Sequence, residues 1–427
     1  MDSAVTLEDL AEQIAAAAKT VGSFLTSNGF PQPSFAKDAA LEFPSAPEDV
    51  LIARRKLREA TKTLHDLVVG PSESLRWLAC NVYHDLSSLR WIYHFKIAEA
   101  VPLDREVAFA EVAATAGVDE RQLRRILRHA MTNNLFHEPR AGFVTHTAES
   151  CLIVRDRGLR DWVGYTSEES FPASTKLVEA TEKYGATEEK NETAYNIAFD
   201  TPLPMFEYLS RHKDRAERFA GTMGAMTATE GYNVSHLVNG FAWDEIGHGT
   251  VVDVGGSIGH ASIAIAEKAT GLRFIVQDLP EIVAQGEASL PGSMKARISF
   301  MAHDFFTPQP VKCADVYLLR FILHDYPDRY AVKILENLVP ALKDGARLIV
   351  MDGVLPEPNT LPKSEERIIR IMDMEMMTTF NAREREIEDW RALFTKSDPR
   401  LKLRNVVKPS GSVNSTMEVI FEGGEST

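Results

Sequence analysis

The sequence contains few cysteines. Only Cys80, Cys151 and Cys313 occur in 427 residues, their number is odd, and there is no CxxC motif. Disulfide frameworks and structural zinc sites both require more cysteines at closer spacing. The sequence therefore predicts neither a disulfide framework nor a metal site, and its cysteine usage is typical of a reducing compartment.

Long hydrophobic runs and an excess of positive charge are also missing. No apolar stretch reaches the roughly 20 residues that a membrane-spanning helix requires. The N-terminal segment MDSAVTLEDLAEQIAAAAKTVGSFL carries acids where a signal peptide carries bases. The chain has 61 acidic and 47 basic residues, and its net charge of −14 argues against a nucleic acid as the main partner. We expect a cytoplasmic protein that binds neither membranes nor nucleic acids.

The N-terminal part of the chain has the sequence pattern of helices. Apolar residues at three- and four-residue steps predict helices over residues 5–27, 47–70 and 72–101. The apolar face of the third helix is wide for the core of one domain. It either belongs to that core or meets a partner subunit.

A helix-turn-helix with a wing is predicted over residues 108–145. Two helical patterns flank a turn at Gly117, and a short hairpin follows them. The second helix carries four arginines, as a DNA-reading helix would: Arg121, Arg124, Arg125 and Arg128. The negative net charge of the whole chain and the lack of another basic cluster favour a winged helix that serves as a scaffold. A DNA-binding regulator stays as an alternative.

The pattern changes after a polar stretch, YGATEEKNETAYN, which separates the two halves of the chain. From there, short β-branched runs alternate with helical ones, and two C-terminal runs suggest a closing hairpin. This alternation predicts βαβ units, that is, an α/β fold whose mostly parallel sheet has helices on both faces. We therefore predict a helical and winged-helix domain over residues 1–185 and an α/β domain over residues 186–427.

The first predicted strand of the sheet leads into a glycine-rich turn. Ligands of open α/β sheets bind at the carboxyl ends of the strands. The turn, DVGGSIG, contains Asp253, Gly255 and Gly256, but Ser257 replaces the second glycine of the dinucleotide fingerprint. A pyrophosphate site is therefore disfavoured, and the acid suits a cationic group such as an amino terminus.

The following strands also end in polar residues. Asp278 lies 25 residues after the first acid, where a carboxylate can accept both ribose hydroxyls, although such an acid can also cap a helix. Asp304 and Phe305 follow the third strand and could reach an adenine. His324 follows the fourth strand, and histidine is the side chain best suited to move protons near neutral pH. Asp352 ends the fifth, so the strand ends together predict one site.

Several segments together resemble the fungal and plant S-adenosylmethionine-dependent O-methyltransferase family, with the fungal polyketide enzymes of the sterigmatocystin type nearest. They are VVDVGGSIGHASIAIAEK, FIVQDLPEIV, MAHDFFTPQPVKCADVYLLRFILHDYPDRYAVKIL and FNAREREIEDW. The resemblance runs from about residue 70 to the C-terminus. It implies a Rossmann-like class I methyltransferase sheet and an N-terminal winged-helix dimerisation domain. It also implies an intertwined homodimer whose partner supplies one wall of the substrate pocket.

The resemblance also implies roles for individual residues. The positions that would hold S-adenosylmethionine are Asp253, Gly255, Gly256, Asp278, Leu279, Asp304, Phe305 and Arg320. His324 falls on the catalytic base, with Asp352 and Glu384 as flanking acids. Asp352 is shorter than the Glu of plant members, so its contact with the imidazole stays open. The substrate-pocket positions are Phe219, Met223, Met377 and Asn381, although a methionine pair at 376–377 also suits a flexible core.

These observations predict an enzyme that moves a methyl group from S-adenosylmethionine to a phenol or enol hydroxyl. The acceptor would be a small aromatic or polyketide-like secondary metabolite, with His324 as the general base. Some members of the family bind the cofactor but catalyse dehydration or pericyclic ring closure, and these tend to alter the base position. Retention of His324 and Glu384 therefore favours methylation. Asp325, next to the base, is expected to be a local structural acid.

Overall fold

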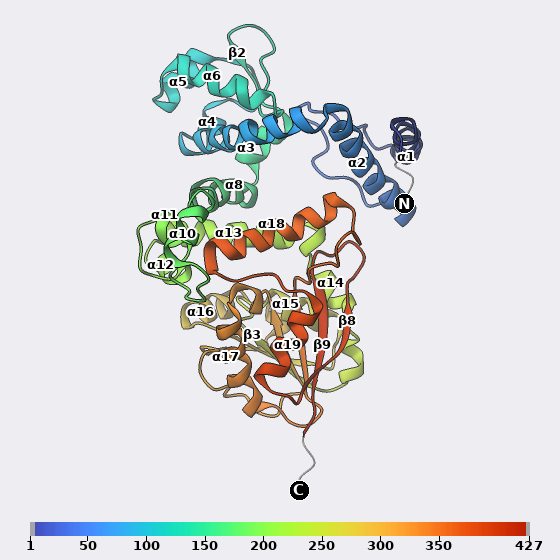
Figure 1. The fold of residues 1–427 in the computed structure, drawn as a ribbon, viewed down its shortest axis with the longest axis vertical. Helices are drawn as coiled ribbons and strands as arrows, with labels where there is room; N and C mark the ends of the chain where they lie inside the picture. Colours follow the sequence, from blue (N-terminus) through green and yellow to red (C-terminus); the bar gives the residue numbers. More distant parts are fainter. Residues whose placement is uncertain (1–4, 424–427) are drawn as a thin grey trace. The chain divides into compact units, whose positions relative to one another are not determined.

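The computed structural model describes residues 5–423 (Figure 1). The chain divides into two compact units. The first unit comprises Met1–Phe171, Glu217–Thr222 and Pro362–Ser364, and the second comprises Pro172–Ala216, Met223–Leu361 and Glu365–Thr427. This division lies N-terminal to the boundary at 185/186 predicted from the sequence. Within residues 5–423, no helix is both long enough and apolar enough to cross a membrane.

The first unit is built mainly from helices. Its elements are α1 (Leu7–Ser27), α2 (Glu48–Val69), α3 (Pro71–His94), α4 (Ile97–Ala100), β1 (Val107–Ala108), α5 (Phe109–Ala116), α6 (Glu120–Met131), β2 (Phe143–Val144), α7 (Ala148–Arg155), α8 (Arg157–Tyr165) and a π-helix, η1 (Thr166–Ser170). The helices α1 and α2 begin and end close to the predicted bounds. Thr6 caps α1 and Gly70 follows α2, as the sequence pattern indicates.

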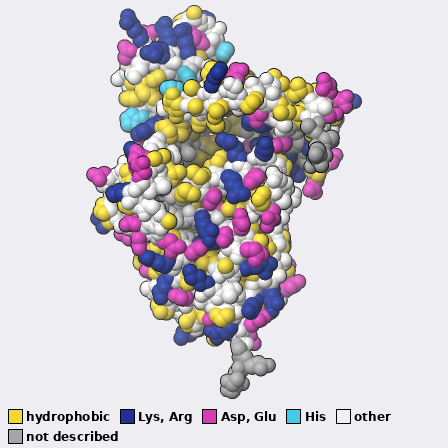
Figure 2. Space-filling view, in the orientation of Figure 1, with side chains coloured by type: hydrophobic (Ala, Val, Ile, Leu, Met, Phe, Trp, Pro, Cys, Tyr) yellow, Lys and Arg dark blue, Asp and Glu magenta, His cyan; other side chains and the backbone are white. Residues whose placement is uncertain are grey.

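The predicted third helix is divided in two. It is interrupted after His94 because Lys96 adopts a left-handed conformation with φ of 52°, so that α4 begins as a separate turn. The apolar face of α3 is partly exposed in the single chain, and Figure 2 shows hydrophobic side chains gathered there. In the N-terminal half of α3, five apolar side chains have exposed fractions of 46–68%: Leu75, Trp77, Leu78, Val82 and Tyr83. In the C-terminal half, Ile92 is fully buried and Leu89 packs against the core of the first unit, so only the N-terminal half of this face lies outside the chain's own core.

The predicted winged-helix segment consists of α5 and α6 followed by a short wing. Gly117 ends α5 in the left-handed conformation, and Asp119 caps α6. The wing strands β1 and β2 pair antiparallel. Two of the four arginines on α6 form ion pairs within the chain, Arg124 with Glu120 and Arg128 with Glu138.

The second unit contains the sheet and most of the remaining helices. Its strands are β3 (Thr250–Val254), β4 (Arg273–Asp278), β5 (Ile298–Ala302), β6 (Val316–Arg320), β7 (Arg347–Asp352), β8 (Leu401–Val407) and β9 (Ser415–Phe421). The α-helices from the end of the first unit onwards are α9 (Phe171–Ser174), α10 (Leu177–Tyr184), α11 (Ala194–Ala198), α12 (Met205–Ser210), α13 (Lys213–Ala228), α14 (Ser235–Gly240), α15 (His260–Lys268), α16 (Pro280–Ser289), α17 (Asp328–Leu338), α18 (Lys363–Phe380) and α19 (Ile387–Ser397). Short helical turns are η2 (Glu230–Tyr232), η3 (Trp243–Ile246), η4 (Gly292–Met294), η5 (Leu323–Asp325) and η6 (Val339–Ala341).

The seven strands form one sheet in the order β5-β4-β3-β6-β7-β9-β8. The first five are parallel, and β9 pairs antiparallel with both β7 and β8. One face packs on α17 and α19, and the other on α14 and α15, each through its own cluster of buried apolar side chains. The predicted α/β fold and the closing hairpin are confirmed.

Candidate active site

The carboxyl ends of the parallel strands bring most of the predicted polar residues to one edge of the sheet. Asp253 lies in β3, while Asp278, Arg320 and Asp352 are the last residues of β4, β6 and β7. Asp304 follows β5 by two residues. Since these strands are neighbours and run in one direction, their ends form a continuous row.

The glycine turn after β3 surrounds a buried carboxylate. The Asp253 Oδ2 atom accepts a hydrogen bond of 2.7 Å from the Ser262 hydroxyl. A Cβ atom at Gly256 would lie 2.5 Å from the carboxyl carbon of Asp253, and one at Gly255 would lie 2.5 Å from Ile322 Cδ1. Both glycines are therefore required by close approach, and Gly255 also has a positive φ of 71°. Burial raises the pKa of Asp253 to about 6, against the opposing effects of Ser262 and Arg320.

Asp278 links two loops and does not cap the following helix through its side chain. Its Oδ2 accepts the N–H of Ser257 and its Oδ1 accepts the N–H of Leu279, both at 2.8 Å. The N-cap residue of α16 is Leu279, whose own side chain is about half exposed. Burial raises the pKa of Asp278, while the two backbone hydrogen bonds lower it. Asp278 thus fixes the glycine turn relative to the end of β4.

The loop after β5 carries a turn and two neighbouring rings, Phe305 and Phe306. The Phe306 N–H donates to Asp304 Oδ1 at 2.9 Å, which fixes the turn. The Phe305 ring packs edge-on against Tyr326, with centroids 5.8 Å apart, and also faces Gly255. An aromatic wall therefore stands between the glycine turn and the loop that carries His324.

His324 lies in η5, between β6 and α17, and it is surrounded by carboxylates. Its Nδ1 is 2.9 Å from Glu384 Oε1, and its Nε2 is 3.5 Å from Asp325 Oδ1. Asp352 accepts the backbone N–H of Leu323 at 3.2 Å through Oδ2. The open question about Asp352 is thereby answered, since this carboxylate holds the backbone beside the imidazole and both ring nitrogens face other acids.

This cluster has strongly perturbed protonation. Burial alone lowers the pKa of His324, but Asp325, Glu384 and Asp352 outweigh it and raise the pKa to about 10. Burial also raises the pKa of Asp325 to about 6 and that of Asp352 to about 7, although His324 lowers both. A titratable cluster of this kind, buried at the ligand-binding edge of a sheet, indicates a functional site.

Four buried polar atoms near this edge have no hydrogen-bond partner among the described residues. They are Tyr232 Oη, Arg320 Nε, Asp352 Oδ1 and Glu384 Oε2. Native proteins leave few such atoms unpaired, so a group of them suits a polar ligand. The other end of the Arg320 guanidinium donates to the Tyr232 carbonyl at 2.9 Å. The donor and acceptor set therefore fits a ligand that carries both a cationic group and hydroxyls.

Two family models match the chain. An O-methyltransferase domain matches residues 183–398, and an O-methyltransferase dimerisation domain matches residues 77–156. The chain belongs to the O-methyltransferase family. Its methyl donor is S-adenosylmethionine, so the family, the enzyme class and the cofactor expected from the sequence are confirmed.

Named relatives of the methyltransferase come from fungi. O-methyltransferase VdtC of Byssochlamys spectabilis is 44% identical, covering 97% of this chain and 98% of VdtC. Chlorophenol O-methyltransferase of Trichoderma longibrachiatum is 38% identical, covering 97% of this chain and 90% of its own. The methyltransferase therefore belongs with fungal secondary-metabolite enzymes.

Solved structures share the fold of the methyltransferase. OxaC in complex with sinefungin and meleagrin has a TM-score of 0.77 at 21% identity, covering 98% of this chain and 100% of its own. LepI in complex with SAM has a TM-score of 0.72 at 23% identity, covering 96% and 100%. The predicted class I methyltransferase fold is confirmed.

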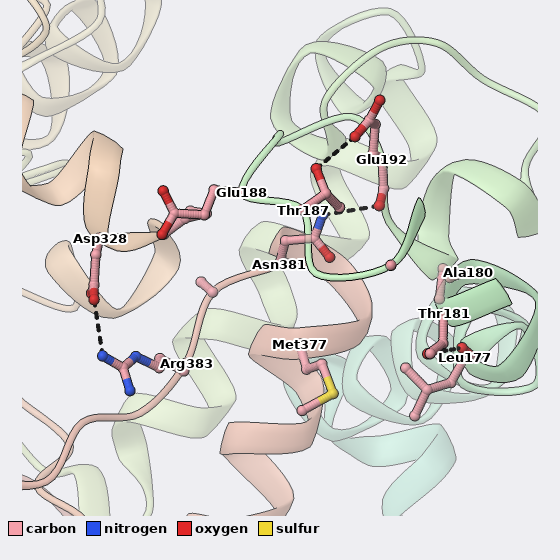
Figure 3. A pocket seen from close by; sticks show the side chains of 14 residues that line it. Leu177, Ala180, Thr181, Thr187, Glu188, Glu192, Asp328, Met377, Asn381 and Arg383 are labelled. Atoms are coloured by element: carbon pink, nitrogen blue, oxygen red, sulfur yellow. Dashed lines mark hydrogen bonds and ion pairs between the residues drawn. The ribbon is translucent and has the colours of Figure 1, made fainter. Parts of the chain in front are cut away.

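The predicted substrate-pocket residues of the methyltransferase lie in different surroundings. Met377 and Asn381 line a cavity of about 440 Å³ in the second unit, and Figure 3 shows them on α18 and just after it. The Asn381 side chain also donates to two carbonyl oxygens, those of residues 189 and 192, at 2.8 and 2.9 Å. Phe219 belongs to the first unit and packs against Tyr165, and Met223 is half-buried in α13.

Sequence reasoning missed two residues of the methyltransferase site. Asp325, expected to be only a structural acid, faces Nε2 of the imidazole. Arg385 is fully buried and donates to the carbonyl oxygens of Leu323 and Tyr326, at 2.8 and 2.9 Å. It therefore fixes the backbone on both sides of His324. Its adjacency to Glu384 is a signal in the sequence, but its acceptors are backbone atoms some 60 residues away, which no side-chain pattern reveals.

Proposed function

We propose that the enzyme methylates a phenol or enol hydroxyl of a small polyketide-like metabolite, with His324 as the general base. The observation that carries this proposal is the contact between His324 Nδ1 and Glu384 Oε1. Because Glu384 accepts the Nδ1 proton, the remaining nitrogen, Nε2, is the one that can take a proton from an acceptor. Positioned bases of this kind contribute on the order of 10²–10⁴-fold to the rate.

The proposed cofactor residues have the chemistry that the donor requires. S-adenosylmethionine, when bound, supplies an electrophilic methyl group and a positive charge. Asp253 would face its ammonium group, Asp278 its ribose hydroxyls, and Asp304 with Phe305 its adenine. The burial of Asp253 and the unpaired Arg320 Nε on the same edge of the sheet support the assignment.

The proton chemistry of His324 depends on charge balance. With three carboxylates around it, its raised pKa favours the imidazolium form at neutral pH. A positive charge bound nearby lowers the pKa of an imidazolium, so a loaded site would present a neutral imidazole to the acceptor. A phenol has a pKa of about 10, and little of it is ionised at pH 7. Once His324 has taken the proton, Glu384 and Asp325 stabilise its charge.

A phenolic acceptor is supported by one relative, whose name specifies a chlorophenol. Met377 offers a partly exposed, polarizable surface in the lining of the cavity, which suits a flat ring. We also propose that the chain acts as a homodimer. Its match to a dimerisation domain and the exposed apolar face of α3 support this assembly.

The test is transfer of a labelled methyl group from S-adenosylmethionine to a panel of phenols and fungal aromatic polyketides. His324→Ala should lose turnover while its affinity for S-adenosylmethionine stays within a few-fold, because the imidazole serves the acceptor. An equivalent change at exposed His65 serves as the control. Product formed without label would support a dehydratase or pericyclase, and an active His324→Ala variant would exclude the proposed base.

A further inference from the structure

The polar stretch that separates the two halves of the sequence forms several hydrogen bonds and ion pairs within the second unit. Its central part, residues 187–192, is here called the strap. Asn381 binds two of its carbonyl oxygens, as described above. Its own Thr187 hydroxyl donates to Glu192 at 2.5 Å, which Figure 3 shows. The strap is therefore an ordered part of the second unit.

Lys190, in the middle of the strap, sits among aromatic rings. Its Nζ lies 4.7 Å from the centroid of Phe306, 4.8 Å from that of Tyr330 and 6.0 Å from that of Tyr326. An ammonium over ring faces is attracted by their negative quadrupoles, and more strongly when it is shielded from water. Lys190 is half-buried, so this attraction is only partly screened.

Carboxylates around Lys190 favour its charged form. Burial lowers the pKa of Lys190 overall, and Glu207, Asp304 and Glu189 oppose this effect without cancelling it. Asp304 is the acid proposed for the adenine side of the cofactor. The ammonium thus contacts three rings and lies in the field of nearby acids, one of which belongs to the proposed cofactor site.

The neighbouring residue fixes the strap to α17. Glu189 pairs with Arg329 at 2.9 Å and accepts the Tyr330 hydroxyl at 3.0 Å. Both partners lie in the first turn of α17, directly after the loop that carries His324. The strap therefore contacts three of the segments that carry proposed site residues: the Asp304 loop, the His324 loop and the residues before Glu384.

We propose that Lys190 is a positioning residue of the cofactor site, because its ammonium holds Phe306, Tyr326 and Tyr330 together. In this arrangement the loop that presents Asp304 and the loop that presents His324 keep a fixed separation. The inference rests on the proposed assignment of the cofactor residues. Lys190 acts through the rings and touches no reacting atom.

The experiment compares Lys190→Met and Lys190→Arg in the full-length protein. Methionine keeps much of the side-chain bulk but removes the charge, so KM and Kd for S-adenosylmethionine should rise roughly three- to thirtyfold, as expected for a partly shielded cation–π contact. The value of kcat should fall as well, because the His324 loop loses its fixed distance from the Asp304 loop. Arginine keeps the cation and should restore most of the affinity.

Lys183 provides a matched control. Its Nζ lies 4.7 Å from the Tyr184 ring, and Lys183 is exposed and is not among the proposed cofactor residues, so Lys183→Met should leave KM and Kd for S-adenosylmethionine unchanged. A double-mutant cycle with Phe306→Leu tests the route of the effect. If Lys190 acts through this ring, Lys190→Met should weaken binding less in the Phe306→Leu background.

Two outcomes overturn the inference. One is a Lys190→Met variant with unchanged KM, and the other is a Lys190→Arg variant no better than Lys190→Met. Asp278→Asn separates these failures from failure of the proposed cofactor site. If Asp278→Asn weakens cofactor binding and Lys190→Met does not, only the role of Lys190 is wrong. If neither variant changes cofactor binding, the assigned cofactor site is wrong as well.

Discussion

The contact between Glu384 and His324 allows a quantitative prediction for Glu384→Gln. Glutamine has the size of glutamate but no charge, so the variant removes one of the three carboxylates that raise the pKa of the imidazole. A unit charge about 4 Å away is worth about 4 kcal/mol at an effective dielectric constant near 20. One pKa unit equals about 1.36 kcal/mol. The pKa of His324 should therefore fall from about 10 to about 7 in the variant.

The direction of the activity change follows from the same argument. In the free enzyme, kcat/KM should rise with pH as His324 loses its proton, and this rise should move about three pH units lower in Glu384→Gln. The plateau should fall on the order of 10²-fold, because the base is weaker and its cation less stabilised.

The pKa can be followed by NMR titration of labelled histidine, and the activity by a pH–rate profile. Exposed Glu388 on α19 provides the matched control, Glu388→Gln. If the titration of His324 is unchanged in Glu384→Gln, the two side chains are not electrostatically coupled and the proposed base assignment loses its support.

Two further predictions concern the surroundings of the base. Arg385→Lys keeps the charge but cannot reach both carbonyl oxygens beside His324, so kcat should fall at least tenfold and the free energy of unfolding by about 2–4 kcal/mol, measured by steady-state kinetics and denaturant titration. Normal kcat in a folded Arg385→Lys variant would show that the two hydrogen bonds from Arg385 to the backbone are not needed for catalysis. Burial raises the pKa of Asp352 to about 7, so folding disfavours its ionised form and stability declines as pH rises from about 4 towards 7. Asp352→Asn should therefore raise the free energy of unfolding at pH 8 by about 1–4 kcal/mol while lowering kcat, and an unchanged pH dependence of stability would contradict this reasoning.

The order of elements could be predicted from the sequence because each strand is a short apolar run bounded by polar or glycine residues. The same logic identified the row of strand-end residues, since parallel strands place their carboxyl ends on one edge. The break between α3 and α4 could not be predicted. It depends on a left-handed backbone at Lys96, a residue type that usually continues a helix.

The contacts of the site were harder to predict than its location. The partners of His324 depend on side-chain directions within a single 3₁₀ turn. These directions place Nε2 near Asp325, while Asp352 accepts a backbone N–H and not an imidazole N–H. Arg385 binds main-chain oxygens, and Lys190 binds rings that lie over a hundred residues away. Interactions of this kind carry no periodic signal, so only the folded chain reveals them.

Gly353, which follows Asp352, restricts which substitutions the site can accept. A Cβ atom there would overlap Oε2 of Glu384, and the carbonyl oxygen of the same glycine accepts the Trp390 indole N–H at 3.0 Å. A side chain at this glycine would therefore displace the Glu384 carboxyl group and disturb its contact with His324. Positions 353 and 384 are consequently coupled as a pair, and a lineage or library that replaces this glycine has to reposition or shorten the glutamate as well.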